Sequence, residues 1–206
     1  YRTALSVNPA AVVELCPCGT SYAFHNMPAM NQSVASDPES SWQVRLKGKT
    51  IKALMGASAA YAGDHVELSD RGDDFASTVG IGAVVSTKFT WPADPRPENG
   101  LLLTPAKEKD WRRWIALYKE KRLPEGGYRG ELYDIAFDRP EAHVVEKDGR
   151  LYYAFYADRW DGPIELRGLG RGRYTVVDYV NGRPLGTVAG NSNRLQVSFT
   201  QYLLLE

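Results

Sequence analysis

The stretch 142–157, AHVVEKDGRLYYAFYA, contains two largely apolar runs joined by Lys147-Asp148-Gly149. Strand-like runs of this length, rich in Val, Tyr and Phe, are typical of β-strands that bury one face. An Asp-Gly pair between two such runs is a strong signal for the turn of a β-hairpin. The stretch therefore predicts an antiparallel hairpin, and the pattern continues on both sides of it.

Further turn signals follow at Asn181-Gly182 and Gly190-Asn191. Short strands with turn signals about every 8–12 residues are the signature of an antiparallel sandwich. The sequence therefore predicts a C-terminal antiparallel β-sandwich domain over residues 123–206. Its expected strands are residues 128–137, 142–146, 150–157, 162–166, 173–179, 194–199 and 202–206.

Residues 1–122 follow a different pattern, in which short apolar runs alternate with helical or loop segments. Strand, helix, strand, loop and strand in this order indicate a parallel α/β structure. The expected strands are residues 11–16, 59–66 and 82–91, and the expected helices are one from Pro38 onward, one at 74–79 and one at 105–122. The last is clearly amphipathic, and its apolar stripe is Trp111, Trp114, Ile115, Leu117 and Tyr118.

Three parallel strands leave edges and apolar faces uncovered, so this region is not expected to be self-sufficient. A (β/α)8 barrel needs roughly 250 residues, and only about 115 precede the sandwich. The predicted fold class is therefore α/β plus all-β: the last strands and helices of a (β/α)8 barrel over residues 1–122, followed by the sandwich. Because the chain opens YRTALSV without a methionine, we expect the missing barrel units upstream of Tyr1.

The composition excludes some function classes. The 25 acidic and 25 basic residues balance, so no strong field favours nucleic acid or an anionic membrane. No apolar run approaches the roughly 20 residues that span a bilayer. With 43% hydrophobic and 24% charged residues, the chain is expected to be an ordinary soluble globular protein. A secreted, periplasmic or cytoplasmic location and a homo-oligomeric state all stay open.

The two cysteines, Cys16 and Cys18, are too close in the chain for a disulfide of normal geometry. Together with His25 they could suggest zinc, but a fourth ligand at a usual spacing is missing. We therefore expect no metal and no cofactor, and thiols that pack or line a site.

The stretch 31–49, NQSVASDPESSWQVRLKGK, raises the question of what Asp37 does. An aspartate directly before a proline is typical of a helix N-terminus, which makes a cap the simplest interpretation. In a barrel, however, polar residues at the carboxyl ends of strands carry the chemistry. Polar clusters follow the three expected strands at residues 16–20, 63–65 and 88–91, and Asp37 lies in the loop after the first.

Several stretches in combination resemble the α-galactosidase (melibiase) members of glycoside hydrolase family 36. They are CPCGTSYAFHNMPAMNQSVASDPESSWQVRLKGKTIKALMG (16–56), YAGDHVELSD (61–70) and DDFASTVGIGAVVSTKFTWP (73–92). The segments GPIELRGLGRGRYTVVDYVNGRPLG (162–186) and YLLLE (202–206) resemble the sandwich that follows the barrel in that family. The resemblance covers essentially the whole chain and places it in the family's C-terminal part.

The family consists of retaining α-glycosidases whose acid/base is an aspartate in a Ser-Asp motif followed by an arginine. The resemblance implies that Asp37 is the proton donor and that Arg45 is the arginine. The family's nucleophile lies on an earlier strand, so this chain is expected to hold half of an active site. Its expected partners are an oligosaccharide or glycoconjugate substrate and the upstream part of the barrel.

The family's Glu-x-Cys-x-x-Gly strand end matches Glu14, Cys16 and Gly19, with Thr20 in place of a second glycine. Its His-Val after the next strand matches His65-Val66. We expect the sugar pocket to be shaped by Cys18, Gly19, Thr20, Trp42, Arg45, Asp64, His65, Lys88 and Trp91. In this interpretation Asp64 and Lys88 bind hydroxyl groups and Trp91 offers a flat apolar face.

Two alternatives remain open at this stage. One is action on α-linked N-acetylgalactosamine or galactosamine by an enzyme of the same family, with the difference sought in residues 16–20. The other is a carbohydrate-binding protein without catalytic activity, in which the sandwich is a lectin-like module. Each polar residue also has a structural interpretation: Asp64-His65 as a hydrogen-bonded pair, Lys88 as a solvated charge and Cys18 as a small packed residue.

Overall fold

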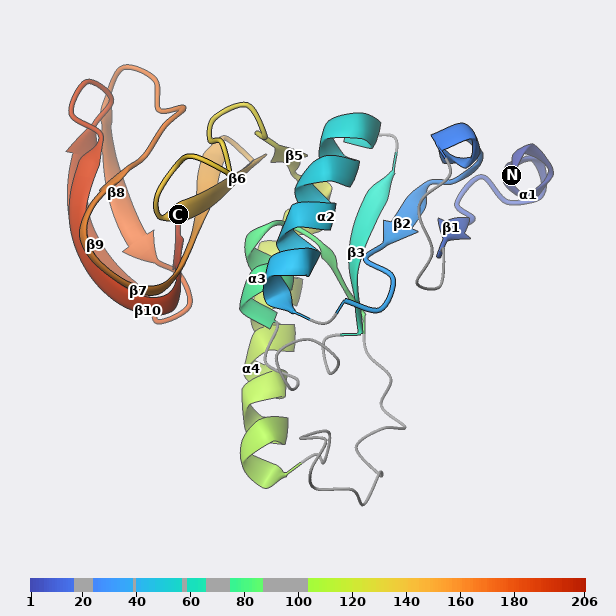
Figure 1. Ribbon diagram of the computed structural model, residues 1–206, viewed down its shortest axis with the longest axis horizontal. Helices are drawn as coiled ribbons and strands as arrows, with labels where there is room; N and C mark the ends of the chain where they lie inside the picture. The colour runs from blue at the N-terminus through green and yellow to red at the C-terminus, as the bar shows by residue number, and fades with distance from the viewer. Residues whose placement is uncertain (17–23, 39, 57–58, 66–74, 87–103) are drawn as a thin grey trace. The chain divides into compact units, whose positions relative to one another are not determined.

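The computed structural model of the chain describes residues 1–16, 24–38, 40–56, 59–65, 75–86 and 104–206, with only the backbone of Phe24 and His65. The chain divides into two compact units (Figure 1). The first comprises residues 1–79 and 83–124 and is called the parallel unit below. The second comprises residues 80–82 and 125–206 and is called the antiparallel unit.

The parallel unit contains a sheet whose four strands lie side by side in the order of the chain. They are β1 (Glu14–Leu15), β2 (Gln32–Val34), β3 (Ala60–His65) and β4 (Val84–Ser86). Every pairing between them is parallel. The sequence predicted three of these strands, but it missed β2, because Gln-Ser-Val is too short and too polar to form a strand pattern.

Two helices connect consecutive strands of this sheet: α2 (Ser41–Met55) joins β2 to β3, and α3 (Phe75–Gly80) lies between β3 and β4. The expected helix from Pro38 begins later, at Ser41, because the hydroxyl of Ser40 accepts a hydrogen bond from the Gln43 N–H at 3.4 Å and caps the helix. The interpretation of Asp37 as the cap is therefore wrong. A short helix α1 (Arg2–Val7) and a 3-10 helix η1 (Phe24–Ala29) precede β2.

The predicted amphipathic helix is α4 (Pro105–Lys121). Thr104 caps its first turn, and a left-handed Arg122 ends it with φ 51°. Trp111 and Trp114 are buried and pack on Phe75 of α3, with ring centroids 5.6 and 6.3 Å away. Trp111 and Trp114 of the apolar stripe thus belong to the core of the parallel unit.

The antiparallel unit is a six-stranded sheet in the order β5-β6-β7-β10-β8-β9. Its strands are β5 (Gly127–Tyr128), β6 (Glu141–Lys147), β7 (Arg150–Glu165), β8 (Arg173–Asp178), β9 (Arg183–Ala189) and β10 (Arg194–Leu205). All pairings are antiparallel, and β6 and β7 form the hairpin that the sequence predicted. The antiparallel C-terminal region is therefore confirmed.

Several strand boundaries differ from the prediction. Figure 1 shows β7 and β10 as long curved strands, each of which unites two predicted short ones. Polar residues interrupt the apolar pattern without ending the strand, and β10 continues through a bulge at Thr200/Gln201. Residues 129–137 are mostly turn, and β9 was missed because its residues are largely exposed and carry little apolar pattern.

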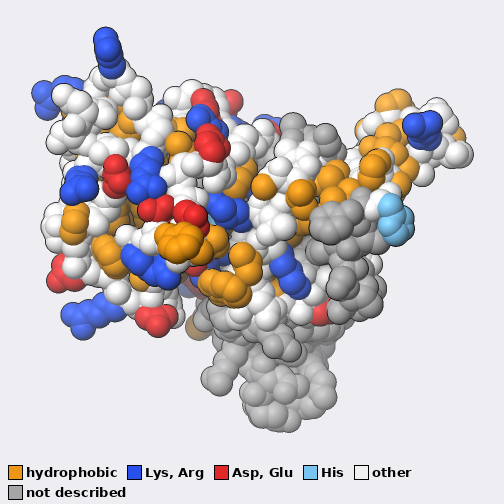
Figure 2. All heavy atoms as spheres, turned by 45° about the horizontal axis from the view of Figure 1, so that its top comes forward, with side chains coloured by type: hydrophobic (Ala, Val, Ile, Leu, Met, Phe, Trp, Pro, Cys, Tyr) orange, Lys and Arg blue, Asp and Glu red, His pale blue; other side chains and the backbone are white. Residues whose placement is uncertain are grey.

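One face of the curled sheet forms the core of the antiparallel unit. The core residues are Tyr133, Ala142, Val144, Tyr153, Phe155, Ile164, Leu166, Val176, Val188, Val197, Leu203 and Leu205. On the outside, basic and acidic side chains lie interspersed over the visible face of this unit (Figure 2). This face therefore presents no large field of a single sign, in agreement with the balanced composition.

Candidate functional site

Asp37 lies three residues beyond the end of β2, in a turn at the carboxyl end of the parallel sheet. The N–H of Ala35 still donates to the carbonyl of Ala62 on β3 at 3.0 Å, so the pairing of the two strands extends almost to the turn. Sequence reasoning placed Asp37 in the loop after the first strand. The missed strand β2 instead brings it directly to the strand end, where parallel α/β sheets hold their sites.

Asp64 lies at the same end of the neighbouring strand β3 and contacts this turn. Its carboxylate Oδ2 accepts a hydrogen bond from the backbone N–H of Asp37 at 2.6 Å. Asp64 is only 5% exposed. The sequence predicted that Asp64 would bind a sugar hydroxyl; the structure engages this carboxylate with the backbone that carries the expected acid.

The backbone is left-handed at three non-glycine residues of this region: Ser36 (φ 58°), Asp37 (φ 46°) and Asp64 (φ 64°). Each such residue costs on the order of 1 kcal/mol, since Cβ approaches the following carbonyl oxygen. Backbone of this kind persists only where the surroundings hold it, and it is concentrated at functional sites. Because it occurs at the ends of two adjacent strands, β2 and β3, we take this part of the parallel unit as the candidate functional site.

Lys47 of α2 is a part of this region that sequence reasoning missed. Its Nζ donates to the carbonyl of Ala35 at 2.6 Å and lies 3.2 Å from the carbonyl of Ser36. In the sequence Lys47 is one of several lysines in a helix of mixed periodicity, and only the fold shows that it faces the turn.

The Asp37 side chain is exposed, although its backbone is anchored. Trp42, which was expected to shape the sugar pocket, lies in the first turn of α2 and is 52% exposed. Within the described residues, the carboxylate of Asp37 is thus open to solvent. Desolvation of the acid would have to come from parts of the site outside these residues.

Arg45 is buried on α2, where Nη1 donates to the hydroxyl of Ser77 on α3 at 2.8 Å. This contact joins the two helices behind the sheet. The structure thus gives Arg45 a place in the packing of the parallel unit, while a sugar contact for it stays a prediction.

The remaining predicted site residues can be placed only in part. Cys18, Gly19, Thr20, Lys88 and Trp91 lie outside the described residues. The backbone of His65 ends β3 and pairs with Ser86, and its side chain is not among those described. The structure therefore brings Asp37 and Asp64 together and leaves the other contacts as predictions.

No group of three or more His, Cys, Asp or Glu side chains in the described part of the chain could hold a metal ion. The thiol of Cys16 is exposed and not in a disulfide. In the described residues, none of the helices has the length and apolar character needed to cross a membrane.

The antiparallel unit contains a cavity of about 450 Å³, which no predicted site residue lines. Aromatic and aliphatic side chains, Tyr153, Tyr174 and Leu151 among them, form its walls, and Arg129, Glu146 and Glu206 add charge. Ligand cavities of proteins generally have this size and this mixed lining.

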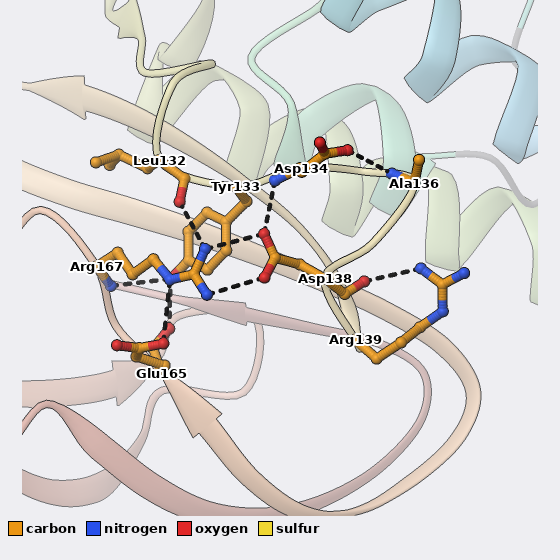
Figure 3. A network of polar contacts seen from close by, with 8 residues as sticks. All are labelled: Leu132, Tyr133, Asp134, Ala136, Asp138, Arg139, Glu165 and Arg167. Atoms are coloured by element: carbon orange, nitrogen blue, oxygen red, sulfur yellow. Dashed lines mark hydrogen bonds and ion pairs between the residues drawn. The ribbon is translucent and has the colours of Figure 1, made fainter.

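A second cavity of the antiparallel unit, of about 360 Å³, is bordered by a polar network around Arg167 (Figure 3). Nη1 and Nη2 of Arg167 donate to the two carboxylate oxygens of Asp138 at 2.9 and 2.8 Å, and Nε donates to Glu165 at 3.1 Å. The guanidinium also lies over the Tyr133 ring, 4.8 Å from its centroid, and Nη1 donates to the Leu132 carbonyl. The network ties residues 132–138 to the end of β7.

The antiparallel unit also contains a buried chain of hydrogen bonds from Tyr128 through His143 to Glu141. The Tyr128 hydroxyl lies 2.6 Å from Nδ1 of His143, and Nε2 lies 2.8 Å from Glu141. Burial, and then the charge of Glu141, raise the pKa of Tyr128. A phenol that keeps its proton donates to Nδ1, which leaves Nε2 to donate to the carboxylate.

Comparisons with known proteins give one close relative by sequence. The chain is 34% identical over 214 residues to "A type blood alpha-D-galactosamine galactosaminidase" of Flavonifractor plautii, and the alignment covers 100% of this chain. It covers 18% of that protein, so the chain spans less than a fifth of its relative. No protein-family model matches the sequence.

Two solved structures are similar in fold. One is a protein of Bacteroides fragilis with the provisional name alpha-galactosidase: TM-score 0.58, 10% identity, 94% of this chain and 46% of that one. The other is AmyP in complex with maltose: TM-score 0.51, 12% identity, 91% of this chain and 51% of that one. At such identities the likeness shows the fold alone. Both chains are about twice as long as the part that this chain matches.

Proposed function

The chain resembles the C-terminal part of the α-galactosidase-like glycoside hydrolases of family 36, and we propose that it supplies the proton-donor part of such an active site. In this proposal Asp37 is the acid/base of a retaining glycosidase. The position of Asp37 carries the proposal: it lies on a strained, anchored turn at the carboxyl end of β2, beside the end of β3.

The topology of the parallel unit supports this role. Its four strands run parallel in the order of the chain, without the reversal of strand order that marks a doubly wound sheet. A barrel requires this sequential order, and barrel enzymes hold their catalytic residues at the carboxyl ends of the strands. We therefore propose that residues 1–122 are the last units of a (β/α)8 barrel.

Retaining hydrolysis of a glycosidic bond needs two carboxyl groups, one as proton donor and one as nucleophile, about 5–5.5 Å apart. We propose that Asp37 donates the proton to the leaving oxygen and that the nucleophile comes from an upstream strand. Trp42 is offered as an apolar face for the sugar, since its indole is exposed in the first turn of α2.

The substrate class in this proposal is a terminal α-linked sugar of galactose configuration. The relative from Flavonifractor plautii is named a galactosaminidase, which supports the alternative of an amino group at the 2-position. Aryl α-glycosides of galactose, galactosamine and N-acetylgalactosamine, compared by kcat/KM, would distinguish these candidates.

Asp37→Asn in the full-length protein tests the proposed acid. Removing a general acid costs about 10²–10⁴-fold in rate. Hydrolysis of an unactivated substrate is therefore expected to fall by this amount while the sugar still binds. The matched control is Asp158→Asn, at an exposed position of β7. Unchanged hydrolysis of an unactivated α-galactoside by Asp37→Asn would remove Asp37 from this role.

A second candidate function is sugar binding by the antiparallel unit, favoured by its cavity of about 450 Å³ with Tyr153 and Tyr174 in the walls. Aromatic rings stack on the apolar faces of sugars, and the charged rim could bind hydroxyl groups. Tyr174→Ala distinguishes the candidates: it should weaken galactoside binding if the cavity is the site, and should leave kcat/KM unchanged if Asp37 marks the site.

A further inference from the structure

Side chains from two neighbouring elements, β3 and α2, form hydrogen bonds with the backbone of the turn that carries Asp37. We propose that Asp64 and Lys47 are positioning residues, which fix this turn so that the Asp37 carboxyl is held at a constant place for proton transfer. The inference rests on the proposed function, since it takes Asp37 as the proton donor. It gives Asp64 a different role from the direct sugar contact that the sequence predicted.

Asp64 holds the turn from the β3 side. Its Oδ2 accepts the Asp37 N–H at 2.6 Å, a short bond of the kind formed by an ionised acceptor. The residue is 5% exposed, so water competes little for this carboxylate. Gly63 fixes the approach of Asp64, because a Cβ there would lie 2.5 Å from the Thr78 hydroxyl of α3.

Lys47 holds the turn from the helix side. The ammonium group donates to the Ala35 carbonyl at 2.6 Å and reaches the Ser36 carbonyl at 3.2 Å. It reaches both carbonyls from the second turn of α2. Backbone groups of three consecutive residues, 35 to 37, are therefore bound by two charged side chains of opposite sign.

The left-handed backbone explains why two anchors are needed. Ser36 and Asp37 have φ of 58° and 46°, and without support a turn of this kind relaxes to more favourable angles. Because the Asp37 side chain is exposed while its N–H is bound, its backbone is fixed and its carboxyl projects outward. Preorganised geometry of this kind matters because small displacements of a catalytic group cost rate steeply.

The test compares two substrates in the full-length protein: an aryl α-glycoside with a good leaving group and one with a poor leaving group. Formation of the glycosyl-enzyme, which kcat/KM reports, needs the proton only for the poor leaving group, whereas its later hydrolysis needs Asp37 as base for both substrates. Lys47→Met and Asp64→Ala are therefore expected to lower kcat/KM for the poor leaving group by about 10–100-fold, and for the good one by less than about threefold. Asp64→Asn keeps an acceptor oxygen and should retain more of the rate.

Lys119→Met, at an exposed position of α4, is the matched control and should leave both rates unchanged. If Asp64 binds the sugar directly, Asp64→Ala lowers kcat/KM for both substrates alike, which overturns the inference. Equal losses of kcat/KM on both substrates in Lys47→Met overturn it as well. If Asp64→Ala does not fold, Asp64→Asn and Lys47→Met carry the same comparison.

Asp37→Asn, measured beside them, distinguishes a failure of the positioning role of Asp64 and Lys47 from a failure of the proposed acid role of Asp37. If it loses kcat/KM only on the poor leaving group and the two positioning variants do not, the inference fails and the proposed function stands. If Asp37→Asn itself shows no difference in kcat/KM between the substrates, the proposed function fails, and the inference fails with it.

Discussion

Arg167 of the antiparallel unit binds mainly carboxylates, whereas Lys47 and Asp64 of the parallel unit bind backbone. Arg167 is held by the carboxylates of Asp138 and Glu165. Lys47 and Asp64 instead hold the carbonyls and the N–H of one strained turn. The network around Arg167 stabilises the fold, since it joins residues 132–138 to the end of β7. The contacts of Lys47 and Asp64 fix a short segment whose side chain is left exposed.

The two units also differ in how their sheets are completed. The antiparallel sheet has long central strands and a core of its own. Over the residues that the structure describes, the parallel sheet consists of short strands, two of them of three residues and one of two. Short parallel strands with open edges are costly in isolation. The candidate chemistry therefore lies in the unit with the shorter described strands.

The largest effect is expected from opening each core at a matched phenylalanine. Phe155 and Phe75 are both 1% exposed, in the antiparallel and the parallel unit respectively. Truncation of either to alanine should cost about 3–5 kcal/mol of unfolding free energy, because the cavity is only partly refilled. Native-state hydrogen exchange should show Phe155→Ala lowering protection in the antiparallel unit alone, and Phe75→Ala in the parallel unit alone.

Leucine at each position is the conservative control, since it restores most of the volume. Loss of protection over both units from either single substitution would contradict this prediction and would show that the two units unfold together.

Arg167→Met should have the next largest effect. The substitution removes the bidentate ion pair with Asp138 and two further hydrogen bonds. Because the pair is only partly buried, the unfolding free energy should fall by about 2–3 kcal/mol. Arg167→Lys should recover little, because an ammonium cannot reproduce the two parallel bonds. Urea unfolding measures the loss.

Arg171→Met, at an exposed arginine of the same unit, should change stability by less than about 0.5 kcal/mol. A loss as large as that of Arg167→Met would show that the network contributes no more than a surface charge.

Sequence patterns predicted the elements that carry strong local signals. The hairpin around Asp148-Gly149 and the helix that begins at Pro105 both lie where turn chemistry and periodicity specify them. The strand β2 escaped prediction because three residues give no period. The merging of short strands into β7 and β10 also escaped it, because a polar interruption in the sequence does not show whether the backbone turns or continues.

The candidate site was predictable only in part, for a related reason. Asp37 could be singled out by its motif, but its anchors are set by tertiary structure: Asp64 is 27 residues away and Lys47 approaches from a helix. The same holds for Arg167 and Asp138, which are 29 residues apart. Contacts of this range depend on strand register and helix packing, which a single sequence does not specify.

A smaller, pH-dependent effect is expected from Lys52 on α2. Burial lowers the pKa of its ammonium group from 10.5 to about 8. The folded chain therefore binds this proton more weakly than the unfolded chain, so Lys52 reduces stability below about pH 8, and the loss is recovered as the pH rises from 8 to 10.5. Lys52→Met should be more stable than the wild type at pH 7 by about 1–2 kcal/mol, after allowance for partial exposure.

The two proteins should converge in unfolding free energy at about pH 10.5, as measured by urea denaturation across this range. Lys119→Met, on the exposed face of α4, provides the control and should differ from the wild type equally at both ends. A constant difference between Lys52→Met and the wild type would contradict the lowered pKa.

The smallest effect separates the two roles first considered for Asp37. Ser40 caps α2 through a bond of 3.4 Å to the Gln43 N–H, so Ser40→Ala should cost about 0.5–1 kcal/mol. Asp37→Asn should change stability by less than about 0.5 kcal/mol, because the side chain is exposed and asparagine tolerates a left-handed backbone. Thermal unfolding of both variants measures the contrast. A large loss of stability for Asp37→Asn, with none for Ser40→Ala, would contradict this prediction and would show that Asp37, not Ser40, stabilises the start of α2.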